Sequence, residues 1–207
     1  MTKSAWEVWK FGGVSLADGR AMRDAIHRIR KHHGPLAVVA SALAGVTDLL
    51  IAGADAASRG GREEAVTAAA TLKRKHDEVA RHLLKGRRLT QSLATIAESA
   101  REYDAICGAI AVLGHLTPRV RDVVVARGER LSAQLLAAAL ESEGSGAAYL
   151  DAVTIVRTDD RHGSATPSID ATGRRLRRFL RDAGSAAPQR LVIPGFIGAA
   201  PDGSVTT

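Results

Sequence analysis

Near the N-terminus the chain reads Trp6-Glu7-Val8-Trp9-Lys10-Phe11-Gly12-Gly13-Val14-Ser15-Leu16, a short apolar run that ends in a lysine and is followed by two glycines. This pattern predicts a strand that stops where the backbone can approach a ligand closely, because glycine has no Cβ and can take dihedral angles closed to other residues. The N–H groups of Gly12 and Gly13 could then point at an anion, and Lys10 would add a positive charge. A tight turn with a surface lysine is the competing interpretation of these residues taken alone.

The composition indicates a single domain, or one domain with a helical excursion, in 207 residues. Apolar residues make up 45% of the chain but aromatic residues only 3%, so the core must consist mainly of Leu, Val, Ile and Ala. The single cysteine, Cys107, excludes an intramolecular disulfide and fits a reducing compartment. No apolar run approaches the roughly 20 residues of a membrane span. We therefore expect a cytoplasmic protein that makes no contact with membranes.

The formal net charge of +7 raises the question of an anionic partner. The densest basic cluster, residues 174–181, carries five arginines around Leu176, Phe179 and Leu180. That spacing predicts an amphipathic helix with a solvated basic face. We therefore do not expect nucleic acid to be a partner.

The next elements predict a parallel sheet. Residues 18–33 have helical periodicity, and the continuous apolar run at residues 36–40 is typical of a strand buried on both faces. A strand, a helix and a second such strand form a right-handed βαβ unit. Ser41 would then lie just beyond the carboxyl end of a strand, where open α/β sheets bind their ligands. Thr47 is placed as the N-cap of the helix that follows.

Helical patterns dominate residues 62–127, and we expect there a helical insertion between two halves of the sheet. One helix is predicted to end near Arg127 and another to run over residues 131–142. Glu129 would then stand in a first helical turn, where a carboxylate ordinarily serves the helix dipole. Two further strands are expected at residues 147–150 and 191–194. The predicted fold class is α/β, a mostly parallel sheet sandwiched between helices.

Four stretches resemble the motifs of aspartate kinases, in the amino acid kinase superfamily, and occur in the same order. They are K-F-G-G-V-S-L from Lys10, S-A-L-A-G-V-T from Ser41, G-E-R-L-S from Gly128 and P-G-F-I-G from Pro194. Two positions depart from the family: Val14 stands where Thr or Ser is usual, and His162 stands where a T-[DN]-D-x-F-G segment has Phe. His162 is therefore given no role.

The resemblance covers essentially all of the chain but only the first half of a kinase domain. In the family a Thr-Thr pair such as Thr206-Thr207 is followed by L-G-R-G-G-S-D, which supplies an arginine for the substrate carboxylate and a catalytic aspartate. We therefore expect residues 1–207 to be the N-terminal, aspartate-binding part of a catalytic domain, truncated before the nucleotide-binding half and inactive alone. Its helical insertion is expected at about residues 62–127.

The activity that the resemblance implies is ATP-dependent phosphorylation of the L-aspartate side chain to 4-phospho-L-aspartate, the first step of lysine, threonine and methionine biosynthesis. Mg²⁺ would be bound through the ATP phosphates and not by protein ligands, and the full-length protein is expected to be a homo-oligomer. By resemblance, the phosphate-binding residues are Lys10, which is also catalytic, with Gly12, Gly13 and Ser15. The aspartate-binding residues are Ser41, Thr47, Glu129 and Phe196.

Two alternatives stay open. Another member of the amino acid kinase superfamily could act on glutamate or carbamate, although G-E-R-L-S together with S-A-L-A-G-V-T favours aspartate. The chain could also be a non-catalytic fragment that serves as a binding or assembly module.

Overall fold

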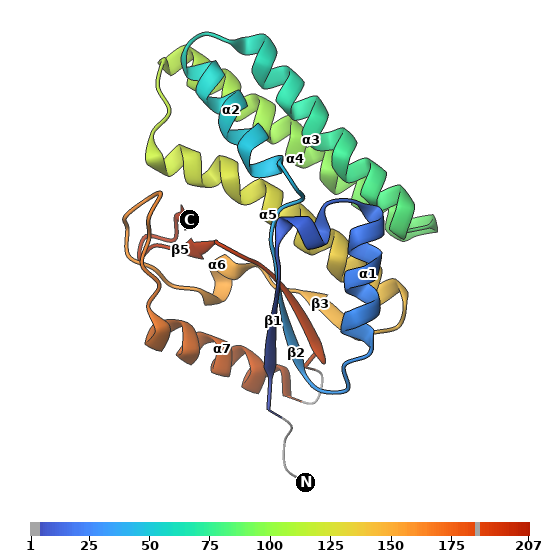
Figure 1. Cartoon of the computed structure of the whole chain (residues 1–207). Helices are drawn as coiled ribbons and strands as arrows, with labels where there is room; N and C mark the ends of the chain where they lie inside the picture. The colour runs from blue at the N-terminus through green and yellow to red at the C-terminus, as the bar shows by residue number, and fades with distance from the viewer. Residues whose placement is uncertain (1–4, 185–186) are drawn as a thin grey trace.

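A computed structural model describes residues 5–184 and 187–207, arranged as a parallel sheet flanked by helices (Figure 1). The main sheet has the order β1-β2-β4-β3, and all its strand pairs are parallel. Its strands are β1 (Glu7–Phe11), β2 (Leu36–Ala40), β3 (Ala147–Tyr149) and β4 (Arg190–Pro194), and a separate antiparallel pair is formed by β5 (Gly198–Ala199) and β6 (Val205–Thr206). The helices are η1 (Gly13–Leu16), α1 (Gly19–Arg30), α2 (Val46–Ser58), α3 (Arg62–Leu83), α4 (Gly86–Leu113), α5 (Pro118–Ser142), α6 (Ala152–Ile155) and α7 (Ile169–Ala183).

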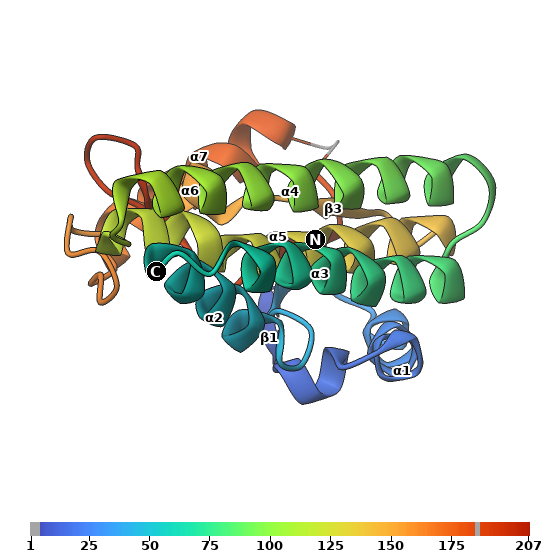
Figure 2. The same cartoon turned by 90° about the horizontal axis from the view of Figure 1, so that it is seen from above.

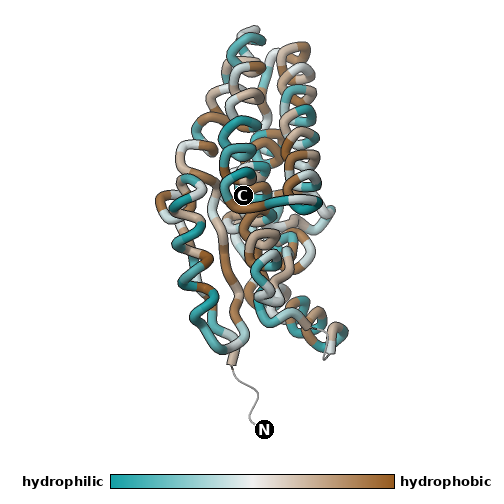
Figure 3. Tube along the Cα trace, turned by 90° about the vertical axis from the view of Figure 1, so that its right-hand side faces the viewer, coloured by the Kyte–Doolittle hydropathy of each residue, from teal (hydrophilic) through white to brown (hydrophobic). Residues whose placement is uncertain are grey.

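The sheet separates two hydrophobic cores, as successive side chains of a strand point to opposite faces. Leu36 and Val38 of β2 belong to the larger core, which includes α1, α5 and the helices beyond them, whereas Ala37 belongs to the smaller core under α6 and α7. The tube in Figure 3 shows a continuous hydrophobic strand in the middle of the molecule and alternating polar and apolar residues along the helices. These observations confirm the predicted α/β class and the mostly parallel sheet.

Helices α2, α3, α4 and α5 form a layer at the end of the sheet to which β1 runs, and α3, α4 and α5 lie side by side when seen from above (Figures 1 and 2). Tyr103 of α4 donates a hydrogen bond to the Leu50 carbonyl of α2 at 2.9 Å. A Cβ on Gly53 would lie only 2.2 Å from the Tyr103 Oη, so this contact requires a glycine. No helix in residues 5–184 and 187–207 is both long and apolar enough to cross a membrane.

The helical layer also differs from expectation. The sequence predicted a helix that ends near Arg127, but α5 is one helix of 25 residues that passes through Gly128 without a break. His76 is fully buried in α3, and burial lowers its pKa to about 4. Because α5 continues past residue 127, the boundary of the helical insertion stays a proposal.

Candidate functional site

The carboxyl ends of three strands meet at the edge of the sheet nearest the helical layer. Beyond the ladder itself, the Ser41 N–H donates to the Phe11 carbonyl at 3.1 Å, and the Gly195 N–H donates to the Ala40 carbonyl at 2.9 Å. These two bonds hold the first residue after β2 against the end of β1, and the first residue after β4 against the end of β2. Three of the four sequence motifs are therefore brought together by the parallel register.

The fourth motif reaches the same place from the middle of α5. A Cβ on Gly128 would lie 2.9 Å from a methyl group of Val46 and 3.0 Å from the Ala42 Cβ, so only glycine allows α5 to pack this closely. Ser132, one turn further on, donates from its Oγ to the Ser41 carbonyl. Ser132 thus ties α5 to the end of β2, a positioning role that the sequence did not indicate.

Glu129 is consequently not in a first helical turn, and the prediction that placed it there is wrong. It lies near the middle of α5, whereas the helix dipole acts within the first and last turns. A dipole role therefore does not account for this carboxyl group.

The Glu129 carboxyl group is buried and incompletely paired. Its residue is 9% exposed, its Oε2 has no hydrogen-bond partner, and a Cβ on Gly195 would lie 3.2 Å from that oxygen. Burial raises the pKa of Glu129 to about 8, although the charge of Lys10 and the Ala42 backbone oppose the shift. A buried carboxyl group with a raised pKa, at the carboxyl ends of parallel strands, is typical of a functional site.

The glycine loop differs in detail from the prediction. The φ angle of Gly12 is −77°, and Gly13 is not among the residues with positive φ, so neither glycine takes a left-handed conformation. Gly13 is needed for close approach instead, since a Cβ there would lie 3.3 Å from the Ala42 carbonyl oxygen. A Cβ on Gly12 would meet no protein atom within 4 Å, so the space beside it is open. Lys10 and Ser15, two and three residues away in the chain, are both exposed.

Thr47 is placed differently from expectation, and Phe196 is exposed. The N-cap of α2 is Gly45, with φ 73°, so Thr47 is the second residue of the helix and not its cap. Phe196 has a positive φ of 52°, and its side chain is 72% exposed at the rim of an apolar hollow of about 410 Å³ between β4 and the β5–β6 pair. Whether Phe196 closes over a substrate stays a prediction.

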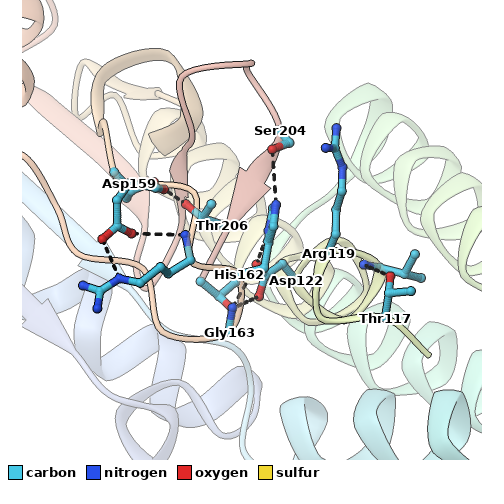
Figure 4. Close-up of polar contacts among 12 residues, drawn as sticks. Thr117, Arg119, Asp122, Asp159, His162, Gly163, Ser204 and Thr206 are labelled. Carbon is cyan, nitrogen blue, oxygen red and sulfur yellow. Dashed lines mark hydrogen bonds and ion pairs between the residues drawn. The ribbon is translucent and has the colours of Figure 1, made fainter. Parts of the chain in front are cut away.

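A second buried carboxylate on α5, Asp122, was missed in the sequence (Figure 4). It accepts hydrogen bonds from the His162 Nδ1 at 2.7 Å, the Gly163 N–H at 3.1 Å and the Thr207 Oγ1. His162 is the residue that departs from the family motif, and that departure was the one signal available. His162 therefore has a definite structural role, which is to pair with Asp122.

The residues described by the structure contain no group of three or more His, Cys, Asp or Glu side chains that could hold a metal ion.

Comparison with known proteins places this geometry in a family. Residues 6–207 match the model of the amino acid kinase family. Lysine-sensitive aspartokinase 3 of Escherichia coli (strain K12) is 32% identical over 207 residues, which cover 97% of this chain and 42% of that protein. A bifunctional aspartokinase/homoserine dehydrogenase 1 of Arabidopsis thaliana is 28% identical, with 98% of this chain and 22% of that protein covered.

Solved structures give the same result. The crystal structure of E. coli aspartokinase III in complex with aspartate and ADP superposes with a TM-score of 0.82 and 27% identity, covering 97% of this chain and 42% of that one. The aspartate kinase of Clostridium acetobutylicum shares the fold, with a TM-score of 0.70 and 21% identity. The chain thus spans less than half the length of these relatives. Its resemblance to the N-terminal half of an aspartokinase catalytic domain is confirmed, and the chain belongs to the amino acid kinase family.

Proposed function

We propose that this chain is the aspartate-binding part of an aspartokinase, an enzyme that transfers a phosphoryl group from ATP to the side-chain carboxylate of L-aspartate. The product would be 4-phospho-L-aspartate, the first intermediate of lysine, threonine and methionine biosynthesis. The chain spans 42% of the E. coli relative, so we assign the complete reaction to a longer protein. We expect residues 1–207 alone, with a helical insertion at about 62–127, to bind aspartate weakly and not to turn over ATP.

The observation that carries the proposal is the buried carboxyl group of Glu129, whose Oε2 has no hydrogen-bond partner. A buried carboxyl group without a partner is costly unless a cation or a donor reaches it. The α-ammonium group of an amino acid supplies both the charge and the hydrogen-bond donors, and such charge-assisted bonds are among the strongest in proteins. Glu129 would therefore bind the ammonium group, with Ser41 and Thr47 beside it and Phe196 at the rim.

The glycine loop provides a place for the phosphoryl group. Phosphoryl transfer depends mainly on alignment of the reactants and on stabilisation of negative charge. The open space beside Gly12, the backbone at Gly13 and the exposed Lys10 and Ser15 suit an anion at this position. Mg²⁺ is expected to arrive on the ATP phosphates and to neutralise part of their charge. We further propose that the full-length protein is a cytoplasmic homo-oligomer.

Calorimetric titration of the chain tests the proposal. L-Aspartate should bind, and Glu129→Gln should weaken its binding by about tenfold or more, the cost of one lost charge-assisted contact. Succinate lacks the ammonium group and should bind weakly and equally to both proteins. If L-glutamate binds as tightly as L-aspartate, the substrate would be another one within the family. Failure of L-aspartate to bind at millimolar concentration, or unchanged binding to the variant, would refute the proposed site.

A further inference from the structure

The turn between β2 and α2 connects two of the proposed aspartate ligands. Ser41 precedes this turn and Thr47 follows it, so the conformation of residues 42–45 sets the spacing of the two side chains. Gly45 takes the left-handed φ of 73° and caps α2 without any side-chain hydrogen bond. The first turn of α2 is then closed by the Leu49 N–H, which donates to the Gly45 carbonyl at 3.1 Å.

The turn is held from two sides. On one side lies the glycine loop, since a Cβ on Gly13 would be 3.7 Å from the Ala44 Cα. On the other side lies Lys75 of α3, whose Nζ donates to the Ala44 carbonyl at 2.8 Å. A Cβ on Gly45 would lie 3.8 Å from the same ammonium nitrogen. Lys75 is 31 residues from Ala44 in the chain, so this bond anchors the turn to the helical layer.

Unlike its basic neighbours on α3, Lys75 bonds to a backbone carbonyl and not to a carboxylate. Lys73 and Arg74 each pair with a carboxylate one turn further along the helix, at 2.5 Å and 2.8 Å. Within residues 5–184 and 187–207, Lys75 has no carboxylate within 4.0 Å. It also lines a hollow of about 480 Å³ between α1 and α3. The two carboxylates of that hollow are engaged elsewhere: Asp18 caps α1 and Glu78 pairs with Arg74.

We propose that Lys75 is a positioning residue of the aspartate site. By donating to the Ala44 carbonyl, its ammonium group stabilises the left-handed turn from which α2 begins. The conformation of this turn then fixes the positions of Ser41 and Thr47 relative to Glu129. The inference rests on the proposed function for the identity of the ligand, while the effect on the turn is independent of it.

Three substitutions in the 207-residue chain separate the possible roles. Lys75→Met removes the donor and the charge at similar length, Lys75→Gln keeps a donor without the charge, and Lys75→Arg keeps both. Lys73→Met is the matched control, because it removes a cation from the same helix, two residues away, without touching the turn. Two quantities are measured for each variant: the hydrogen-exchange rate of the Leu49 amide, and the Kd for L-aspartate by calorimetry.

We expect Lys75→Met to speed exchange at Leu49 about tenfold and to weaken aspartate binding by a similar factor, consistent with the loss of one charge-assisted hydrogen bond. Lys75→Gln should be intermediate, Lys75→Arg close to wild type, and Lys73→Met without effect on either quantity. Unchanged exchange in Lys75→Gln and Lys75→Met, or equal changes in Lys73→Met, would overturn the proposal. If wild type binds no aspartate, the proposed function fails, while the exchange rates at Leu49 still decide the role of Lys75.

Discussion

Helix α5 buries two carboxyl groups, Asp122 and Glu129, seven residues or about two turns apart, and their surroundings are opposite. Asp122 is surrounded by donors: an imidazole, a backbone N–H and a hydroxyl group. Glu129 has an oxygen with no hydrogen-bond partner, and burial raises its pKa to about 8. The same helix thus carries one carboxylate that is satisfied within the chain and one that is not.

This difference separates a carboxyl group that stabilises the fold from one that is available to bind a ligand. A buried polar group that is fully hydrogen-bonded contributes to the fold, whereas an unpaired one destabilises it. Asp122 joins α5 to the loop at His162 and to Thr207 beyond β6, so it holds the architecture together. We propose that Glu129 binds a ligand, because the cost of its burial to stability is a reason to expect a cationic group there. The predictions below test this division, from the largest expected effect to the smallest.

Glu129→Gln should stabilise the chain, and the gain should depend on pH. The folded pKa of Glu129 is raised from 4.5 to about 8, so the folded state holds a proton that the unfolded state releases between these values. Relative to the variant, wild type therefore loses stability as the pH rises from 4.5 to 8, by roughly 5 kcal/mol in all at about 1.4 kcal/mol per pKa unit. Urea denaturation at several pH values measures the difference. A constant difference across this range would contradict the account.

The difference between the two proteins, and not the wild-type curve alone, isolates Glu129. His76 acts in the opposite direction, because burial lowers its pKa from 6.5 to about 4. The unfolded state binds the proton more readily between these values, so stability falls as the pH drops from 6.5 to 4. His76 is present in both proteins, and its contribution cancels in the comparison.

Asp122→Asn should destabilise the chain by about 2–3 kcal/mol. The substitution removes the negative charge and one of the two oxygens that together accept hydrogen bonds from three donors. Asp182→Asn is the matched control: Asp182 is exposed and pairs with surface arginines, so its loss should cost under ~0.5 kcal/mol. Chemical denaturation at pH 7 measures both. Equal effects of the two substitutions would show that Asp122 is not the structural partner inferred here.

His162→Phe, which restores the side chain usual in the family motif, should cost less, about 1 kcal/mol. It removes one donor from Asp122 and leaves the Gly163 N–H and the Thr207 hydroxyl group in place. The same denaturation measurement applies. A loss as large as that of Asp122→Asn would mean that the imidazole alone satisfies the carboxylate.

Local signals in the sequence were sufficient to predict the strands of the main sheet. Continuous apolar runs bounded by glycine and proline predicted β2 and β4, and the structure confirms both and their parallel pairing. The course of α5 was predicted wrongly because Gly128 resembles a helix break. Glycine weakens a helix by only about 1 kcal/mol, and the close packing that it allows against Ala42 and Val46 outweighs that loss.

The residues of the candidate site could also be predicted only in part from the sequence. Motifs brought Lys10, Ser41 and Glu129 into consideration, since each stands at the end of a strand or in a recognisable pattern. Asp122 and Lys75 have no local pattern, because their partners lie 40 and 31 residues away in the chain. Such contacts follow from the packing of helices on loops, and only the three-dimensional arrangement reveals them.

The most direct test of the division between Asp122 and Glu129 is the pKa of Glu129, followed by carbon-13 NMR of the side-chain carboxyl group. The resonance is assigned by its absence in Glu129→Gln. We predict a pKa near 8 in the free chain, as burial requires, and a much lower pKa with saturating L-aspartate, because an ammonium group favours the charged carboxylate. Succinate should cause no such decrease. A pKa near 4.5 in the free chain, or a pKa that L-aspartate leaves unchanged, would contradict the account.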